Sequence, residues 1–307
     1  MKRMFAAWLC AILLAVFVTG CGVAPAEPSE VPSDGPAEEV ITEPVVRDFQ
    51  EKPGSQTQFV DSHPVGTTVR YDLNGDGIGE DITVRTHEFE AGQLTIGDAV
   101  CEIWSCTPTG YFTVVNMDDS VNRLLVGISD YGPSDDPETV FYAYDGENIQ
   151  EIGYLSDILG QNVYGYEGAV CHGNGTVTAG VRLDVLGTWN SVGLYRVTDS
   201  VEDITAFYQF IDWDGNPGTW DVTAKHDITM HERESAETVT VVPAGSAMKM
   251  VGLRKGADDV FWVLFEVPDL GKNLWLKTQR IEWASYLQTN VGFISSEEAF
   301  DGFFYAG

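Results

Sequence analysis

The sequence predicts an all-β fold built from many short antiparallel strands. After residue 60, β-branched and aromatic residues gather in short runs such as Ile82–Arg85 and Val140–Tyr144, and turn-forming residues separate these runs. The pair Asp145-Gly146 between two such runs is typical of a tight hairpin turn. Long stretches with helical periodicity are nearly absent. Together these features favour antiparallel sheets over any helical class.

Residues 1–21 are predicted to be a lipoprotein signal peptide. The positive stretch Met1-Lys2-Arg3 precedes an uncharged apolar run from Phe5 to Val18, which is too short for a good transmembrane helix. The run ends in Val18-Thr19-Gly20-Cys21, which resembles the lipobox of bacterial lipoproteins. The resemblance implies that Cys21 is diacylated and anchors the mature chain to the cell membrane on its extracytoplasmic side. An ordinary signal peptide with a chance cysteine is the alternative.

Residues 22–60 are predicted to be a disordered, acidic, proline-rich spacer. They hold six of the thirteen prolines and almost no aromatic residue. Such a segment buries too little apolar surface to offset the entropy that is lost when a chain becomes ordered. A flexible chain of this length spans roughly 30–40 Å, so it would hold a folded part away from the lipid.

The chain is strongly acidic. Once Lys2 and Arg3 leave with the signal peptide, 15 basic and 47 acidic residues give a formal charge of −32. This charge argues against binding of nucleic acid or of anionic lipid headgroups, because both require basic surfaces. It is compatible with divalent cations, with cationic surfaces or with solubility alone.

A candidate metal site lies in the segment YDLNGDGIGEDI, which begins at Tyr71. Its oxygen ligands stand at alternate positions of a glycine-bent loop: Asp72, Asn74, Asp76, the backbone carbonyl of Ile78, and Glu80, with Asp81 as an alternative to Glu80. Calcium takes about six to eight oxygen ligands in flexible geometry, so the loop is predicted to bind calcium. The alternative is an Asx-rich turn that is held by its own hydrogen bonds.

The loop resembles the Asp-x-Asn-Gly-Asp-Gly loop of FG-GAP or VCBS-type β-propeller repeats, in which it joins two strands. An EF-hand fits less well, since it needs flanking helices and a glutamate where Thr83 stands. The resemblance implies that residues 61–220 form antiparallel sheets like propeller blades. The segment is long enough for about three or four blades, so we expect an incomplete propeller.

Residues 221–307 resemble a bacterial SH3-like domain with an aromatic C-terminal tail. The turn Pro243–Ser246 precedes a strand, Phe261–Val267 contains a Trp-Val pair, and Trp275-Leu276 closes the unit. The resemblance implies a small barrel. Met230–Glu234 replaces the usual opening segment of the family, which puts a ligand groove there in doubt. The tail is too apolar to be solvated and is expected to pack on the folded part.

Cys101 and Cys106 are a candidate disulfide pair. An exported protein can form disulfides, and these two cysteines are the closest in the mature sequence. On one straight strand their side chains would point to opposite faces, so a bridge requires a turn or a bulge between them. The sequence leaves the bridge open.

An acidic loop containing Asp130, Asp135 and Asp136 follows the apolar run Leu124–Ile128. We expect the three carboxylates to lie in a solvated loop. Joint binding of a cation or another ligand is the alternative.

Catalytic motifs are missing from the sequence, which favours a binding protein. It contains no G-x-S-x-G, H-E-x-x-H or P-loop motif. Cys171 and His172 are neighbours, so on a strand they point to opposite faces and cannot act as a nucleophile and its base. We expect a calcium-stabilised binding module, not an enzyme, at the cell envelope, with a cell-wall glycan, a peptide or a protein as ligand. The alternative is a cell-wall or glycan hydrolase with an acidic active site, which requires two carboxylates about 5–10 Å apart in one cleft.

Overall fold

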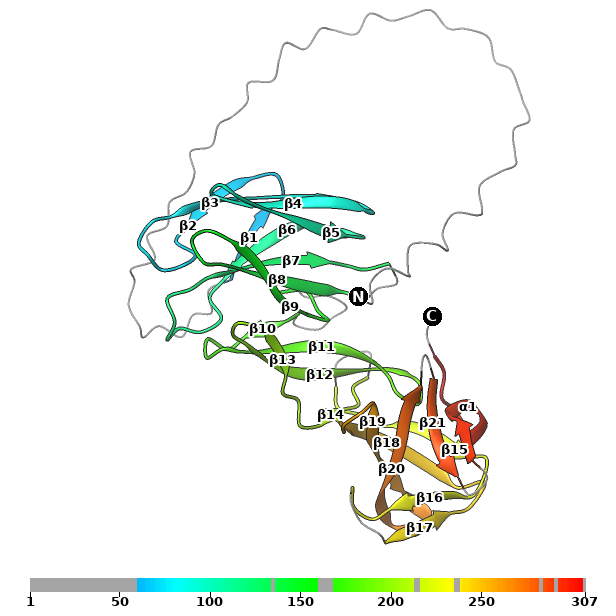
Figure 1. The fold of residues 1–307 in the computed structure, drawn as a ribbon. Coiled ribbons are helices and arrows are strands. Elements are labelled where there is room, and N and C mark those ends of the chain that lie inside the picture. The colour runs from blue at the N-terminus through cyan, green and yellow to red at the C-terminus, as the bar shows by residue number, and fades with distance from the viewer. Residues whose placement is uncertain are drawn as a thin grey trace, which may run out of the picture. The chain divides into compact units, whose positions relative to one another are not determined.

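The computed structural model confirms an all-β protein of antiparallel sheets (Figure 1). It describes residues 60–133, 136–159, 168–212, 216–234, 238–281, 284–289 and 292–305. The predicted signal peptide with Cys21 and nearly all of the predicted spacer lie outside the described residues. Within the described ranges, no helix is long and apolar enough to cross a membrane.

The first sheet is a four-stranded meander in chain order. It contains β2 (Thr68–Tyr71), β3 (Glu80–His87), β4 (Glu90–Ile96) and β5 (Ala99–Ser105). Along β3, Ile82 and Val84 are fully buried, whereas Asp81 and Arg85 are exposed. This alternation follows from the two-residue period of a strand and gives the sheet one core face and one solvated face.

The second sheet has five strands in the order β1-β6-β7-β8-β9. Its strands are β1 (Val60–Pro64), β6 (Pro108–Val115), β7 (Leu125–Asp130), β8 (Glu138–Tyr144) and β9 (Ile149–Leu155). The predicted hairpin turn at Asp145-Gly146 is confirmed: it joins β8 to β9, with Tyr144 opposite Ile149 and a φ of +99° at Gly146.

The third sheet is again a four-stranded meander in chain order. It contains β10 (Val170–Cys171), β11 (Thr176–Asp184), β12 (Thr188–Val197) and β13 (Val201–Asp203). The first three sheets thus contain three successive antiparallel meanders, β2–β5, β6–β9 and β10–β13.

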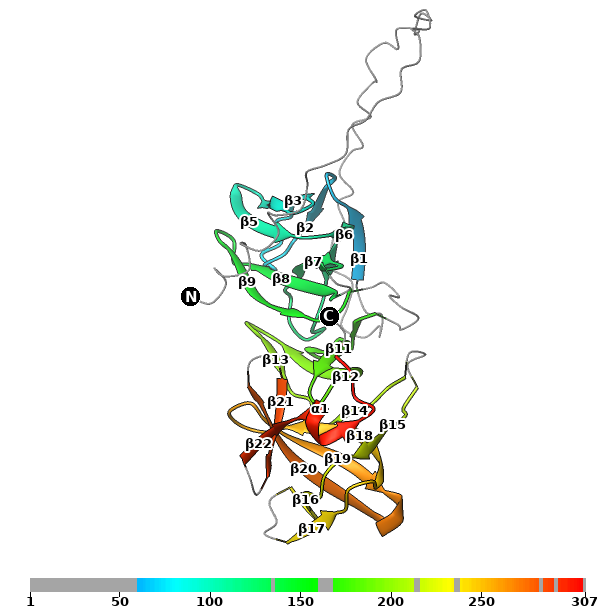
Figure 2. The ribbon, with the colours of Figure 1, turned by 90° about the vertical axis from the view of Figure 1, so that its right-hand side faces the viewer.

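The fourth sheet has ten strands and curls (Figure 2). It contains β14 (Tyr208–Gln209), β15 (Trp220–Ala224), β16 (Ile228–His231), β17 (Val239–Val242), β18 (Ala247–Lys255), β19 (Val260–Val267), β20 (Lys272–Ile281), β21 (Ala284–Thr289), β22 (Gly292–Ser295) and β23 (Phe300–Asp301). A 3-10 turn, η2 (Pro268–Leu270), follows β19, and the helix α1 (Ser296–Ala299) precedes β23. The pairing runs β17-β16-β20-β19-β18-β15-β23, while β14 pairs with β18 and β21 with β20 and β22.

Three hydrophobic cores hold these sheets. The first lies between the first two meanders, and its members include Ile82, Leu94, Phe112 and Val126. The second joins the second sheet to the third, through residues such as Phe141, Leu155, Val177 and Tyr195. The third fills the curled sheet and includes Met230, Val263, Phe265 and Leu274, together with Val185, Leu186 and Trp189 from the β11–β12 hairpin.

The predicted boundary between residues 220 and 221 falls inside β15. The third core crosses this position, because Leu186 and Trp189 pack with residues of the curled sheet. The described residues all belong to one compact unit.

The aromatic tail packs on the folded part, as the sequence predicts. Phe300 is 2% exposed and belongs to the third core, and Phe303 packs against that core. The carbonyl of Phe304 accepts a hydrogen bond from the N–H of Thr188 at 2.9 Å. The indole N–H of Trp220 donates to the carbonyl of Gly302 at 3.0 Å, so the tail is held by its backbone as well as by its rings.

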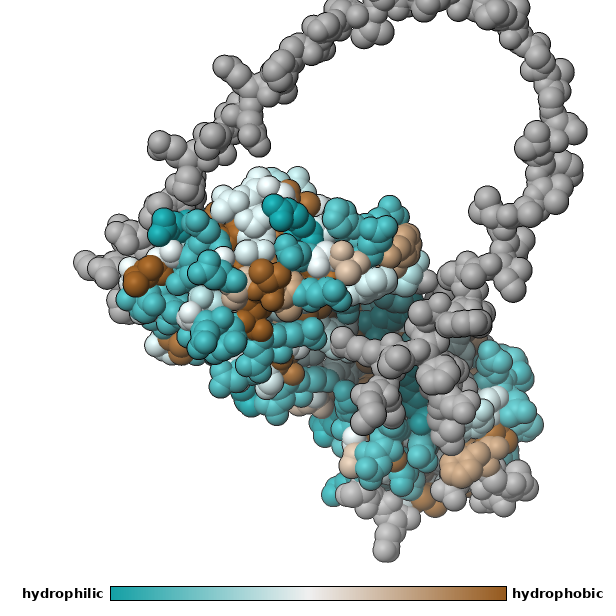
Figure 3. Space-filling model, turned by 45° about the horizontal axis from the view of Figure 1, so that its top comes forward, coloured by the Kyte–Doolittle hydropathy of each residue, from teal (hydrophilic) through white to brown (hydrophobic). Residues whose placement is uncertain are grey.

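Hydrophilic residues cover most of the face in Figure 3, with hydrophobic ones among them. Large exposed hydrophobic residues of the described surface include Trp104 on β5 and Val241 on β17, at 68% and 54% exposure. Exposed apolar side chains are ordinary on folded proteins.

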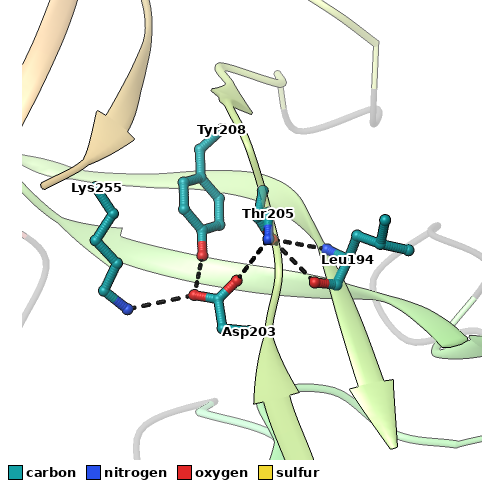
Figure 4. A network of polar contacts seen from close by, with 5 residues as sticks. All are labelled: Leu194, Asp203, Thr205, Tyr208 and Lys255. Carbon is teal, nitrogen blue, oxygen red and sulfur yellow. Dashed lines mark hydrogen bonds and ion pairs between the residues drawn. The ribbon is translucent and has the colours of Figure 1, made fainter.

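A polar network ties the third meander to the curled sheet (Figure 4). Asp203 accepts hydrogen bonds from the hydroxyl of Tyr208 and from the N–H of Thr205 at 3.1 Å, and it pairs with Lys255 of β18 at 3.3 Å. The hydroxyl of Thr205 bonds to the backbone of Leu194 on β12. Burial by itself would raise the pKa of Asp203, but the hydrogen bonds and Lys255 outweigh it and lower this pKa below its ordinary value.

Replacing Tyr208 with phenylalanine is expected to lower the free energy of unfolding by about 1.5–3 kcal/mol at neutral pH, because a hydrogen bond to a charged group is lost. The lowered pKa of Asp203 means that its contribution to stability is present above the unfolded pKa and is lost as pH falls through the folded pKa. The cost of Tyr208→Phe should therefore shrink on acidification, as measured by urea unfolding at stepped pH. Tyr154→Phe, at a half-exposed tyrosine on β9, is the matched control and should cost little at any pH. A cost for Tyr208→Phe that is independent of pH would contradict the role of the Asp203 charge.

Candidate calcium loop

The predicted calcium loop connects β2 to β3. Tyr71 and Glu80 are register partners, so the loop is closed at its base by the first rungs of the sheet. Gly75 and Gly77 have φ angles of +79° and +85°, which glycine adopts without steric cost. A Cβ on Gly75 would also lie 2.2 Å from the carbonyl oxygen of Asn122, so the loop packs tightly against a distant segment of the chain.

Hydrogen bonds inside the loop hold its acidic side chains in place. Asp72 accepts from the N–H groups of Gly75 at 2.7 Å, Asp76 at 3.1 Å and Gly77 at 2.8 Å. Asp76 accepts from the N–H of Ile78 at 2.7 Å, and Asn74 accepts from the N–H of Asp76 at 3.0 Å. The alternative predicted from the sequence is an Asx-rich turn, and the hydrogen bonds of such a turn are present in this loop.

Glu80 completes the acidic group from the first residue of β3. Its carboxylate accepts from the N–H of Leu73 at 3.0 Å, across the loop from its own position. Burial raises the pKa of Glu80, and the negative charges of Asp76 and Asp72 raise it further, against the opposing effect of the Leu73 hydrogen bond. The charges of Asp72 and Asp76 thus disfavour ionisation of Glu80, and a bound cation would relieve this repulsion.

Four of the five predicted ligand residues, Asp72, Asn74, Asp76 and Glu80, have side chains that accept hydrogen bonds from backbone N–H groups of the loop. The fifth, Ile78, has a side chain that is 64% exposed, and it was predicted to contribute only its carbonyl. The oxygen-only donor set suits calcium. In their present rotamers, no three His, Cys, Asp or Glu side chains of the described residues lie close enough together to hold a metal ion. Binding would therefore require the carboxylates to exchange some of their N–H partners for the ion.

Two residues near the loop escape sequence reasoning. The side-chain amide of Asn122 donates to the carbonyl of Gly75 at 3.3 Å. The hydroxyl of Tyr144 donates to the carbonyl of Gly146 at 2.8 Å, and its pKa is raised by burial and by the nearby charge of Glu80. Asn122 reaches the loop through long-range packing, and Tyr144 senses the charge of Glu80, but no local pattern in the sequence signals either relation.

Cys101 and Cys106 are free in the structure, which corrects the candidate disulfide. Strand β5 runs from Ala99 to Ser105 without a shift in its register to β4, so no turn or bulge lies between the cysteines. Five residues of strand span roughly 17 Å, whereas a disulfide needs Cα atoms within about 7 Å.

Asp130 is buried, which corrects the expected solvated loop at this residue. It is 7% exposed and accepts hydrogen bonds from the hydroxyl of Ser105 and from three backbone N–H groups, those of Cys106, Thr107 and Gly132. Asp136 is half-exposed and pairs with Arg182 at 2.7 Å. The third acidic residue, Asp135, lies outside the described residues. The carboxylate of Asp130 therefore holds the segment after β5 and the start of the β7–β8 loop together by hydrogen bonds.

Cys171 has no features of a nucleophile. It is 1% exposed, and burial raises the pKa of its thiol to about 12, so the reactive thiolate is absent at neutral pH. The neighbouring His172 is exposed.

Comparisons of the chain with protein-family models, with curated proteins and with solved structures found no match.

Proposed function

We propose that the protein is a lipid-anchored binding module of the cell envelope, stabilised by calcium at the loop between β2 and β3. The anchor would be the lipid on Cys21, and the acidic spacer would hold the β domain away from the membrane. The ligand would be a glycan, a peptide or a protein of the cell wall. The proposal places the protein outside the cytoplasm, where calcium is available.

The proposed calcium site is supported by the electrostatic environment of Glu80. Burial raises the pKa of Glu80, and the negative charges of Asp76 and Asp72 in the adjoining glycine-bent loop raise it further. A cation held by these side chains, with the amide oxygen of Asn74 and the carbonyl of Ile78, would remove that repulsion.

Binding without catalysis is favoured by how the acidic side chains are used. Asp130 is engaged by four donors within the fold, and Asp203 by a tyrosine, a threonine and a lysine. Groups committed in this way are poorly suited to serve as the acid and the base of a hydrolase.

Cells that express the full chain and are labelled with radioactive palmitate should incorporate the label into the wild-type protein. A Cys21→Ser variant should lose all label and leave the membrane fraction, because the thiol is the acceptor of the lipid. A Cys10→Ser variant is the matched control and should keep both, since that cysteine would leave with the signal peptide. Equal labelling of wild type and Cys21→Ser would rule out the anchor.

The binding part of the proposal is tested with the mature chain, residues 21–307, carrying Cys21→Ser to remove the lipid. The protein is immobilised and screened against peptidoglycan fragments, a panel of neutral and acidic glycans, and envelope proteins. Saturable binding to at least one purified component is expected. Failure to bind any of them would overturn the proposed function.

A further inference from the structure

One face of the curled sheet concentrates tryptophan and basic side chains. In β19, Phe261, Val263 and Phe265 point into the third core, so the residues between them point outward. The strand register places Arg254, Trp262 and Lys277 side by side on β18, β19 and β20, and Trp275 in the adjacent row. These four residues, Arg254, Trp262, Trp275 and Lys277, are named the tryptophan face.

Each cation of this face lies against an indole ring. The guanidinium carbon of Arg254 is 5.6 Å from the ring centroid of Trp275, and the ammonium of Lys277 is 6.0 Å from that of Trp262. His231 packs edge-on against Trp262 at 5.1 Å, and Phe207 against Trp275 at 6.3 Å. Both indoles are half-buried, so their rings are held in place while part of their surface stays open to solvent.

Basic residues outnumber acidic ones at the outward positions of β18, β19 and β20. These positions carry the cations Lys249, Arg254 and Lys277 and one acid, Glu266. Glu266 and Asp221 of β15 are the two register partners of Lys249, which leaves Lys277 without an acidic register partner. The whole chain has a formal charge of −30. Glu234 pairs with Arg254 at 2.7 Å. Neither Lys249 nor Lys277 forms an ion pair with any described residue. Charges more than about 8 Å away are largely screened at physiological ionic strength, so a small ligand on this face would meet the local charge.

We propose that the tryptophan face binds an acidic saccharide, a sugar ring that carries a carboxylate. The inference rests on the proposed binding function and names its ligand class. The C–H groups on one side of a pyranose ring would pack on the negative face of an indole. The carboxylate would take a charge-assisted hydrogen bond from Lys277, whose ammonium stands beside the Trp262 ring.

The tryptophan face favours a ligand that has both a sugar ring and a carboxylate. A simple anion would pair with the ammonium of Lys277 but make no use of the solvent-exposed part of the indoles. A neutral sugar would pack on an indole but bring no negative charge to Lys277. A short oligosaccharide fits better than a long acidic polymer, because the rest of the acidic surface repels the latter.

Isothermal titration of the mature chain, residues 21–307 with Cys21→Ser, tests this inference with trigalacturonate as the probe. Neutral maltotriose and citrate, an anion without a sugar ring, are the reference ligands. Trigalacturonate is expected to bind at least about tenfold more tightly than either reference, the size of effect that one hydrogen bond to a charged group supplies. The Lys277→Gln variant should lose about tenfold in affinity for trigalacturonate while keeping the thermal midpoint of the parent protein, since this side chain is exposed.

Lys272→Gln is the matched control. Lys272 lies on the same strand, but it is five residues away, so the pleat turns it to the opposite side, and it pairs with Glu232 at 2.7 Å. This variant makes the same change in charge and should bind trigalacturonate like the parent. An equal loss in both variants would show that only net charge matters and would overturn the inference.

Two other results would overturn it as well: citrate binding as tightly as trigalacturonate, or no difference between trigalacturonate and maltotriose. Absence of binding to all three ligands would remove the tryptophan face as a saccharide site. The proposed binding function would still hold if the protein binds another component of the envelope panel.

Discussion

Replacing Asp130 with alanine is expected to lower the free energy of unfolding by about 3–5 kcal/mol. The buried carboxylate accepts hydrogen bonds from Ser105 at 2.5 Å and from the N–H groups of Cys106 at 2.6 Å, Thr107 at 3.0 Å and Gly132 at 2.6 Å. Each buried donor left without an acceptor costs about 1–3 kcal/mol, reduced where water can enter the space. Urea unfolding of the mature chain measures the effect.

Asp136→Ala provides the matched control for this prediction. Asp136 lies in the loop that follows Asp130, but it is half-exposed and forms one ion pair with Arg182, so its loss should cost less than about 1 kcal/mol. Asp130→Asn should fall between the two, because an amide keeps one acceptor oxygen but presents N–H groups where the second oxygen stood. Similar values for Asp130→Ala and Asp136→Ala would show that the buried network contributes little.

Calcium at about 100 times its dissociation constant is expected to raise the free energy of unfolding of the wild-type chain by about 2.7 kcal/mol. The Glu80→Gln variant should respond far less, yet in chelator at neutral pH it should be more stable than wild type. It removes a charge that Asp72 and Asp76 repel, while its side-chain oxygen can still accept from the N–H of Leu73. Chemical unfolding with calcium and with chelator measures both effects.

The pH dependence in chelator gives a second readout of the same site. Because the folded state raises the pKa of Glu80, the stability linked to this group is present below the unfolded pKa and is lost as pH rises through the folded pKa. The advantage of Glu80→Gln over wild type should therefore grow with rising pH and then level off.

Asp81→Asn separates the two candidates for the last ligand. Asp81 neighbours Glu80 but points to the solvated face of the first sheet, where it lies 3.8 Å from Arg70. It should retain the full calcium response. The double variant Asp72→Ala/Asp76→Ala should lose that response, and an undiminished shift in this variant would eliminate the loop as the calcium site.

The strands and their turns follow from the sequence because their signals are local. The alternation of Ile82 and Val84 with polar neighbours predicts a half-buried strand, and Asp145-Gly146 predicts the hairpin that β8 and β9 form. The loop at Asp72 could be predicted for the same reason, since its glycines and oxygen ligands lie within one short segment.

Asp130 shows why other features were not predicted. Its hydrogen-bond partners Ser105 and Thr107 lie more than twenty residues earlier in the chain, and the apolar run before it gives no sign that its own side chain is buried. The pairing of His231 with Trp275, which builds one side of the curled sheet, also joins segments without a shared local pattern. Contacts of this kind depend on which strands become neighbours, and strand composition alone does not specify neighbours.

The β11–β12 hairpin has a consequence for how this architecture can be inherited. One end of the hairpin places Val177 and Tyr195 in the second core, and the other end places Leu186 and Trp189 in the third. A gene fragment encoding only the curled sheet would lack part of its own interior, and one encoding only the meanders would leave an indole without cover. Recombination that separates the meanders from the curled sheet would therefore destabilise both parts. The two parts are expected to be inherited together.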